Sequence, residues 1–91
     1  MPNLYRIGGY VIFFWSNEFN EPIHIHIAKK KPTSNATKIW LTKSGGYIIA
    51  NNKSRIVKND LNEIFDVLSI HHSDICEEWQ RHFKTDIKFY C

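Results

Sequence analysis

The sequence has few of the residues with which small proteins replace a hydrophobic core. Its 91 residues include two cysteines, Cys76 and Cys91, which show no CxxC or zinc-ribbon spacing. This pattern predicts reduced thiols and no structural metal. Hydrophobic residues make up 43% of the chain and aromatic residues 14%. That content is enough for one domain over residues 1–91 to fold around its own core.

Long apolar runs and familiar catalytic motifs are also missing. No run reaches the roughly 20 residues that a membrane helix requires. The stretch from Ile7 to Trp15 is rich in aromatic residues and lacks a small-residue cleavage site, so it does not read as a signal peptide. We therefore expect a cytoplasmic protein without membrane contact. Gly-rich phosphate loops, nucleophile elbows and paired carboxylates are absent, which disfavours nucleotide hydrolysis and acyl transfer. We expect no cofactor.

Charge is moderate and locally concentrated. The chain has 12 basic and 9 acidic side chains, for a net charge of +3. This excess permits contact with nucleic acid or an acidic protein without requiring it. Lys29, Lys30 and Lys31 follow one another directly. They are interpreted either as a solvated loop or as phosphate contacts, with Arg6 and Arg55 as more distant helpers.

Four segments have the composition and alternation of β-strands. They are followed by two segments with helical periodicity, near residues 59–70 and 74–83, where Asn59 and either Ser73 or Asp74 are the expected N-caps. The expected strands are Tyr10–Trp15, Ile23–Ala28, Thr37–Thr42 and Tyr47–Ala50. Residues 17–22 are expected to form a turn, and Ile87 and Phe89 are candidates for a short final strand.

This order predicts an α+β fold, with a four-stranded, mainly antiparallel sheet over residues 6–52 followed by two C-terminal helices packed on one face. The expected buried residues are large and apolar, and they fall on one face of each element. They are Phe13 or Phe14, Ile25, Ile39, Ile48, Leu61, Ile64, Leu68 and Trp79.

The segment from Ile23 to Ile27 alternates isoleucine with histidine. If the isoleucines are buried, His24 and His26 lie together on the opposite face, about 7 Å apart along the strand. Three interpretations stay open. The pair fills a partly exposed solvent face, or it is an acid/base or anion-binding pair, or it contributes to a metal site. The last requires at least one more ligand, so we expect no metal here.

Two other residues are candidates for a binding surface. The alternation places Trp40 on the face that Lys38 shares, opposite Ile39. It is interpreted as a core-edge residue or as a stacking platform. His71 lies at the junction of the two expected helices, where an imidazole can cap the end of the first helix or take part in binding.

Several patterns, taken in order, resemble the bacterial domain of unknown function 4160 family. They span nearly the whole chain up to residue 80. Met1-Pro2, Arg6 and Gly9 resemble its start, Pro22-x-His24-x-His26-Ile27 its central Pro-Pro-His-x-His-Val motif, and His71-x-x-Asp74-Ile75 with Trp79 its C-terminal pattern.

The chain departs from that family in three places. Ile23 replaces the second proline, Phe19 and Asn20 stand where a histidine is usual, and the connection at Lys29–Lys31 is longer. Members tend to be encoded beside another small protein. The resemblance therefore implies a two-gene, toxin–antitoxin-like pair whose partner is the neighbouring gene's product.

Two functional hypotheses follow. In the first, the chain binds a protein partner, with RNA as a further candidate ligand, through a face carrying His24, His26 and Lys29–Lys31. If it is an enzyme, metal-independent RNA cleavage fits best, with the two histidines as acid and base. In the second, it is a non-catalytic adaptor or antitoxin-like module. The sequence does not decide whether it is an enzyme, and it leaves the oligomeric state open.

Overall fold

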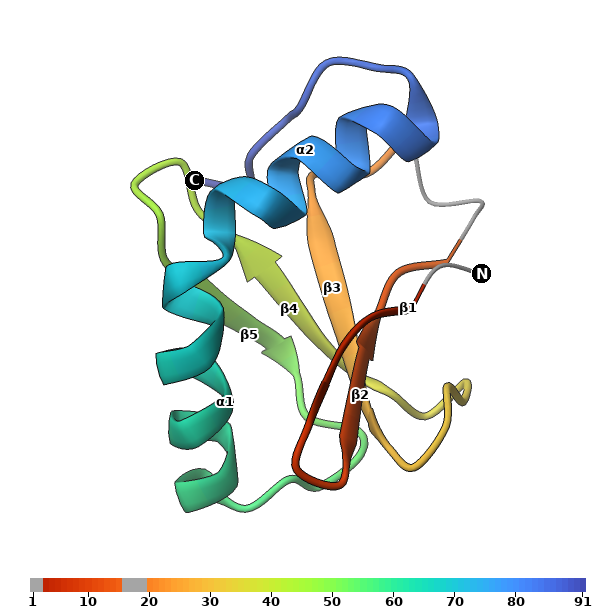
Figure 1. The fold of residues 1–91 in the computed structure, drawn as a ribbon, viewed down its shortest axis with the longest axis vertical. Coiled ribbons are helices and arrows are strands. Elements are labelled where there is room, and N and C mark those ends of the chain that lie inside the picture. Colours follow the sequence, from red (N-terminus) through yellow and green to blue (C-terminus); the bar gives the residue numbers. More distant parts are fainter. Residues whose placement is uncertain (1–2, 16–19) are drawn as a thin grey trace.

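A computed structural model describes residues 3–15 and 20–91. An antiparallel sheet of five strands is ordered as the chain runs, β1-β2-β3-β4-β5. Two helices follow and cover one face of the sheet (Figure 1). Within the described residues, no helix is long and apolar enough to cross a membrane. The element bounds are β1 Asn3–Ile7, β2 Tyr10–Phe13, β3 His24–Lys29, β4 Thr37–Leu41, β5 Tyr47–Asn51, α1 Lys58–Ile70 and α2 His72–Phe83.

The predicted α+β architecture is confirmed, but the predicted number of strands is wrong. The strand that was not predicted is β1, which pairs with β2 across the Gly8-Gly9 connection. Its side chains are only half-buried or exposed, and its register shifts between Asn3 and Tyr5. A strand with a shifted register and no fully buried residue lacks the clean alternation that identifies strands in a sequence.

The main core lies between the sheet and the helices. Alternate residues of the strands point to one face of the sheet and contact the apolar faces of α1 and α2, as the helical periodicity predicts. Ile48, expected to be buried, is instead 38% exposed, because β5 is an edge strand and Ile48 lies opposite Trp40 on the other face of the sheet. The cluster comprises Ile12, Phe14, Ile23, Ile25, Ile27, Ile39, Leu41, Ile56, Leu61, Ile64, Leu68, Ile75 and Trp79.

The other face of the sheet is covered as well, at least over β2 and β3. Val11, Phe13, Ala28 and Ala36 form a second buried cluster, against which Trp15 packs. The alternation in β3 therefore separates two buried faces rather than a buried face from a solvated one. This is why the expectation of partly exposed histidines fails.

The helices begin at residues other than the expected caps. Val57 precedes α1 and His71 precedes α2, and neither makes a side-chain capping bond. At the end of α1, it is the backbone N–H of His71, and not the imidazole that was predicted to act there, that donates to the Leu68 carbonyl. Tertiary packing of the apolar helix faces, rather than local capping, therefore places these helices.

The C-terminal tail, residues 84–91, adds no strand. Ile87 and Phe89 instead pack against the main core. The tail is held to the sheet by two backbone bonds, from the Ile23 N–H to the Lys88 carbonyl (2.7 Å) and from the Lys43 N–H to the Cys91 carbonyl (2.9 Å). The turn expected at 17–22 lies partly outside the described residues.

Candidate functional site

The first candidate, His24, is enclosed by other rings. Its side chain is 0% exposed, and Nδ1 lies 2.8 Å from the Pro22 carbonyl oxygen. The ring centroid lies 5.4 Å from Trp40 and 5.4 Å from Trp79, both in edge-on geometry. Trp79 belongs to α2, which crosses the sheet at the end where β3 begins (Figure 1). His24 therefore joins α2 to the sheet.

The second histidine of the pair is buried beside the first. His26 is 7% exposed, and its ring stacks on Phe13 with centroids 5.5 Å apart and an interplanar angle of 27°. The His24 and His26 rings meet edge-on at 5.1 Å. The predicted proximity of the two imidazoles is thus confirmed, whereas their expected exposure is wrong. Across the described ranges, no group of three or more His, Cys, Asp or Glu residues is arranged to hold a metal ion.

Trp40 lies at the border between this buried cluster and the surface. It is half-buried and stacks on Tyr90 of the tail, with centroids 5.0 Å apart and planes 4° from parallel. The Lys38 Nζ lies 4.3 Å from the centre of the Trp40 ring and 2.6 Å from Glu21 Oε1. One face of the indole is therefore used by Tyr90, which makes Trp40 a core-edge residue.

The lysine run lies at the opposite end of β3 from His24. Lys29 comes five residues after His24 along the extended strand, which places it about 16 Å away. Lys29, Lys30 and Lys31 are exposed, and the Lys30 carbonyl accepts a hydrogen bond of 3.0 Å from Arg6 Nη1. The structure thus brings Arg6 to the lysine run but does not bring the run to His24.

A second loop joins the same end of the molecule. The Ser54 hydroxyl donates to the Ile27 carbonyl (3.3 Å) and to the Asn35 carbonyl (2.8 Å), which fixes the loop between β5 and α1 beside the end of β3 (Figure 1). This loop carries further cations. We call the resulting surface the basic end and define it as Arg6, Lys29, Lys30, Lys31, Lys53 and Arg55.

Two cations of the basic end have an unfavourable backbone conformation. Lys30 has φ = 67° and Arg55 has φ = 55°, in the left-handed region that costs a non-glycine residue about 1–2 kcal/mol. Neither side chain forms an ion pair with a carboxylate within the part of the chain described here. Glycine would suit both positions better for folding, so the positive charges have no evident structural role there.

His71 lies away from both the histidine pair and the basic end. Its Nδ1 is 3.3 Å from Asp74 Oδ2, and its ring centroid is 4.8 Å from that of Tyr5 on β1. It therefore links the junction of the helices to the edge of the sheet. None of the described contacts places it with the other predicted site residues.

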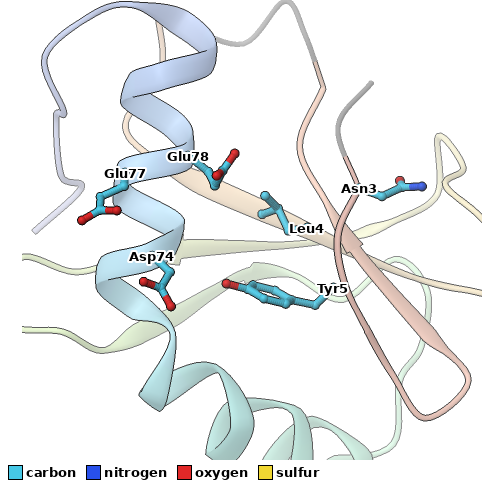
Figure 2. Close-up of a pocket in the computed structure, with 6 residues that line it drawn as sticks. All are labelled: Asn3, Leu4, Tyr5, Asp74, Glu77 and Glu78. Atoms are coloured by element: carbon cyan, nitrogen blue, oxygen red, sulfur yellow. The ribbon is translucent and has the colours of Figure 1, made fainter.

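Two hollows beside β1 were not foreseen from the sequence. One, of about 390 Å³, lies between β1 and α2 and is lined by Asn3, Leu4, Tyr5, Asp74, Glu77 and Glu78. Figure 2 shows the Tyr5 ring reaching from β1 toward Asp74. Burial raises the Tyr5 pKa, and the carboxylates of Asp74 and Glu78 raise it further. The carboxylates make this hollow unfavourable for a phosphate group.

The second hollow, of about 210 Å³, lies between the β1–β2 connection and α1, and Asp60 and Glu63 are among its lining residues. The Tyr10 hydroxyl donates a bond of 2.6 Å to Asp60 Oδ2. This bond is the main reason that the Tyr10 pKa rises to about 12. The acidic residues of both hollows come from helices and their partners from β1 and β2, so no local sequence pattern could have joined them.

These features define a small α+β protein in which a five-stranded meander carries a buried histidine pair and a separate cationic end. The chain belongs to the family described as "Domain of unknown function (DUF4160)", which matches residues 9–80. This confirms the resemblance found in the sequence motifs. No curated protein and no solved structure matches the chain significantly.

Proposed function

We propose that this chain is the non-catalytic docking member of a two-gene, toxin–antitoxin-like pair. In this proposal, the basic end binds an acidic surface of the protein encoded by the neighbouring gene. The gene pairing comes from the family resemblance. The observation that carries the choice of surface is the pair of cations, Lys30 and Arg55, held at left-handed backbone positions.

Any residue other than glycine is costly to keep at such positions, because its Cβ crowds the backbone. A strained residue at an exposed site is a reason to look for a function there. Here two separate loops each hold a cation in that conformation, and hydrogen bonds from Ser54 fix the two loops to one end of the sheet. An acidic protein surface is the complement that such a cluster favours, and the resulting attraction also speeds association.

The buried state of His24 favours docking over catalysis. A general base must reach the proton that it abstracts, directly or through one water molecule. The His24 side chain is 0% exposed, and about 16 Å of strand lies between it and Lys29. A ribonuclease that used both groups on one phosphate would require the molecule to open. The histidine pair is better explained as packing between α2 and the sheet.

RNA is the second candidate ligand of the same surface, because exposed lysines also contact phosphates. Beside the basic end, Tyr10 pairs with Lys29 across the sheet, and its phenol is bonded to Asp60 rather than offered to a base. The aromatic pair Trp40 and Tyr90 stacks at 5.0 Å on β4 and the tail, not at the basic end. Single-stranded RNA usually requires such stacking platforms, so a protein partner is favoured.

The test is co-expression with the neighbouring gene and co-purification, followed by titration of the two proteins at several salt concentrations. A variant with Lys29, Lys30 and Lys31 changed to glutamine should lose affinity and show a weaker salt dependence. The matched control changes the same number of exposed lysines elsewhere, Lys43, Lys84 and Lys88, and should bind like the wild type.

Three outcomes would contradict the proposal. Equal binding by the two triple variants would exclude the basic end as the docking surface. Binding of RNA, but not of the neighbouring protein, with a salt slope that falls by about one counterion per removed lysine would favour the RNA ligand. RNA cleavage that is lost in His24→Ala while binding persists would favour the enzyme.

A further inference from the structure

We propose that β5 is a dimerisation edge, at which two copies of this chain pair antiparallel through Tyr47–Ile49 to make one continuous sheet. The strand order ends at β5, which within the described residues pairs only with β4. Backbone groups on the outer side of an edge strand are a template for a further strand. This surface is separate from the basic end, and the inference does not depend on the proposed function.

The side chains of β5 lack the usual protection of an edge. The strand reads Tyr-Ile-Ile-Ala-Asn, without charge or proline, whereas edge strands in monomers commonly carry lysine, proline or inward-pointing charges. Ile48 is 38% exposed and Ile49 is 45% exposed. On the face of the sheet that the helices cover, the Tyr47 hydroxyl donates a hydrogen bond of 2.7 Å to the Leu68 carbonyl of α1. The helix therefore covers Tyr47 but leaves the side chain of Ile49 partly exposed.

A bulge determines which part of β5 can pair. Lys38 lies opposite Asn51 and Ile39 opposite Ile49, which leaves Ala50 as the extra residue. Such a bulge disturbs the alternation and limits further pairing. The regular part is Tyr47–Ile49, and its central residue is Ile48. A twofold axis there places Ile48 opposite its own copy and Tyr47 opposite Ile49 of the other copy.

The occupant that this register fits best is a second copy of the same strand. Aromatic residues opposite β-branched ones are favourable cross-strand pairs, and the twofold register creates two of them. It brings no like charges together, because the strand has none. The two Ile48 side chains would meet beside Trp40, against which Tyr90 stacks while remaining 58% exposed. Four apolar rings and two isoleucines then cover one side of the junction.

The experiment is sedimentation of the full chain over a wide range of concentrations. We expect a reversible monomer–dimer equilibrium, because three residue pairs make a smaller interface than stable dimers need. Ile48→Lys sets two ammonium groups opposite each other and should raise the dimer dissociation constant at least about tenfold. Ile70→Lys, at a residue 77% exposed at the end of α1, is the matched control and should sediment like the wild type.

Cross-linking tests the register without relying on a charged substitution. With the exposed Cys91 changed to serine, Ile48→Cys should form a dimeric disulfide on oxidation, because directly opposite residues lie within disulfide range. Ile49→Cys should not, since its copies lie diagonally, about 7–8 Å apart. Circular dichroism checks that each variant is folded.

The proposal is overturned if the wild type is monomeric at every concentration, or if Ile48→Lys dimerises like the wild type. A monomeric wild type whose binding to the neighbouring protein is lost in Ile48→Lys would mean that a foreign strand uses this edge. The lysine-to-glutamine variant of the basic end should dimerise normally, so the failure of one proposal is distinguishable from the failure of the other.

Discussion

The phenol of Tyr10 and the carboxylate of Asp60 are joined by a hydrogen bond of 2.6 Å across 50 residues of sequence. It ties β2 to the first turn of α1, beside the second hollow. The bond holds only while the phenol keeps its proton. It therefore makes the attachment of the helix layer to the sheet sensitive to alkaline pH.

Because the pKa of Tyr10 is raised from 10.0 to about 12, the native state holds this proton more tightly than the unfolded chain does. The stabilisation is fully present below pH 10.0 and is lost as the pH rises toward about 12. We expect Tyr10→Phe to be less stable at pH 8 but to lose stability less steeply over that alkaline range. Urea unfolding at a series of pH values measures both effects. Parallel curves for the two proteins would contradict the prediction.

His24→Ala should destabilise the fold. The substitution removes a fully buried ring that contacts Trp40 and Trp79, and large-to-small changes at such sites cost about 2–5 kcal/mol. His71→Ala is the comparison, because its ring is only half-buried and should cost about 1 kcal/mol or less. Denaturant unfolding gives both values. If His24→Ala were as stable as the wild type, the role of the ring would be catalysis or binding instead of packing.

Lys30→Gly and Arg55→Gly should each stabilise the fold and weaken partner binding. Relief of the left-handed conformation offsets the greater freedom of glycine in the unfolded chain, for a net gain of a few tenths to about 1 kcal/mol. Loss of one exposed cation should weaken binding about two- to fivefold. Lys84 has φ = 52° at the end of α2, so Lys84→Gly should gain the same stability and bind normally. Unchanged binding in all three variants would remove the main support for the basic end.

Asn52 holds the loop that carries Arg55. Its side-chain oxygen accepts from Thr37 Oγ1 (2.7 Å) and from the Ile56 N–H (3.0 Å), and its amide nitrogen donates to the Ile56 carbonyl (2.9 Å). Asn52→Ala should cost about 1–3 kcal/mol. Asn51→Ala, which loses a single bond of 3.3 Å to the Lys53 N–H, should cost less than about 0.5 kcal/mol. Thermal unfolding compares the stabilities of the two variants directly. Equal losses of stability would contradict the role of Asn52 in holding this loop.

Sequence periodicity was sufficient for the parts of the fold in which one face of an element is buried. The helix positions Leu61, Ile64 and Leu68 are buried as predicted, because a 3.6-residue repeat has one consistent packing solution. Alternation in β3 located both faces of the strand correctly. It could not show that the second face is also covered, because that cover comes from Phe13 at the end of β2 and from Trp15 two residues beyond it.

The candidate site was predicted less well, because its parts meet only in three dimensions. The lysine run could be recognised because its three residues are consecutive in the sequence. Arg55 lies at the same end of the molecule only because hydrogen bonds from Ser54 to residues 27 and 35 hold its loop there. The left-handed conformation of Lys30 leaves no trace in composition, since lysine has no preference for it. The acidic hollows depend on how β1 lies against α2 and how the β1–β2 connection lies against α1, and β1 itself had no strand signal in the sequence.

The order of the strands also bears on how quickly the protein folds. Each strand after β1 pairs with the one that precedes it in the chain, so the sheet can grow strand by strand over connections of two to ten residues. Short loops carry a small closure entropy, and predominantly local contacts go with rapid folding. The long-range steps are the docking of α1, through Tyr10 and Asp60, and the return of the tail to Ile23. Substitutions at these two contacts should therefore change the unfolding rate far more than the folding rate.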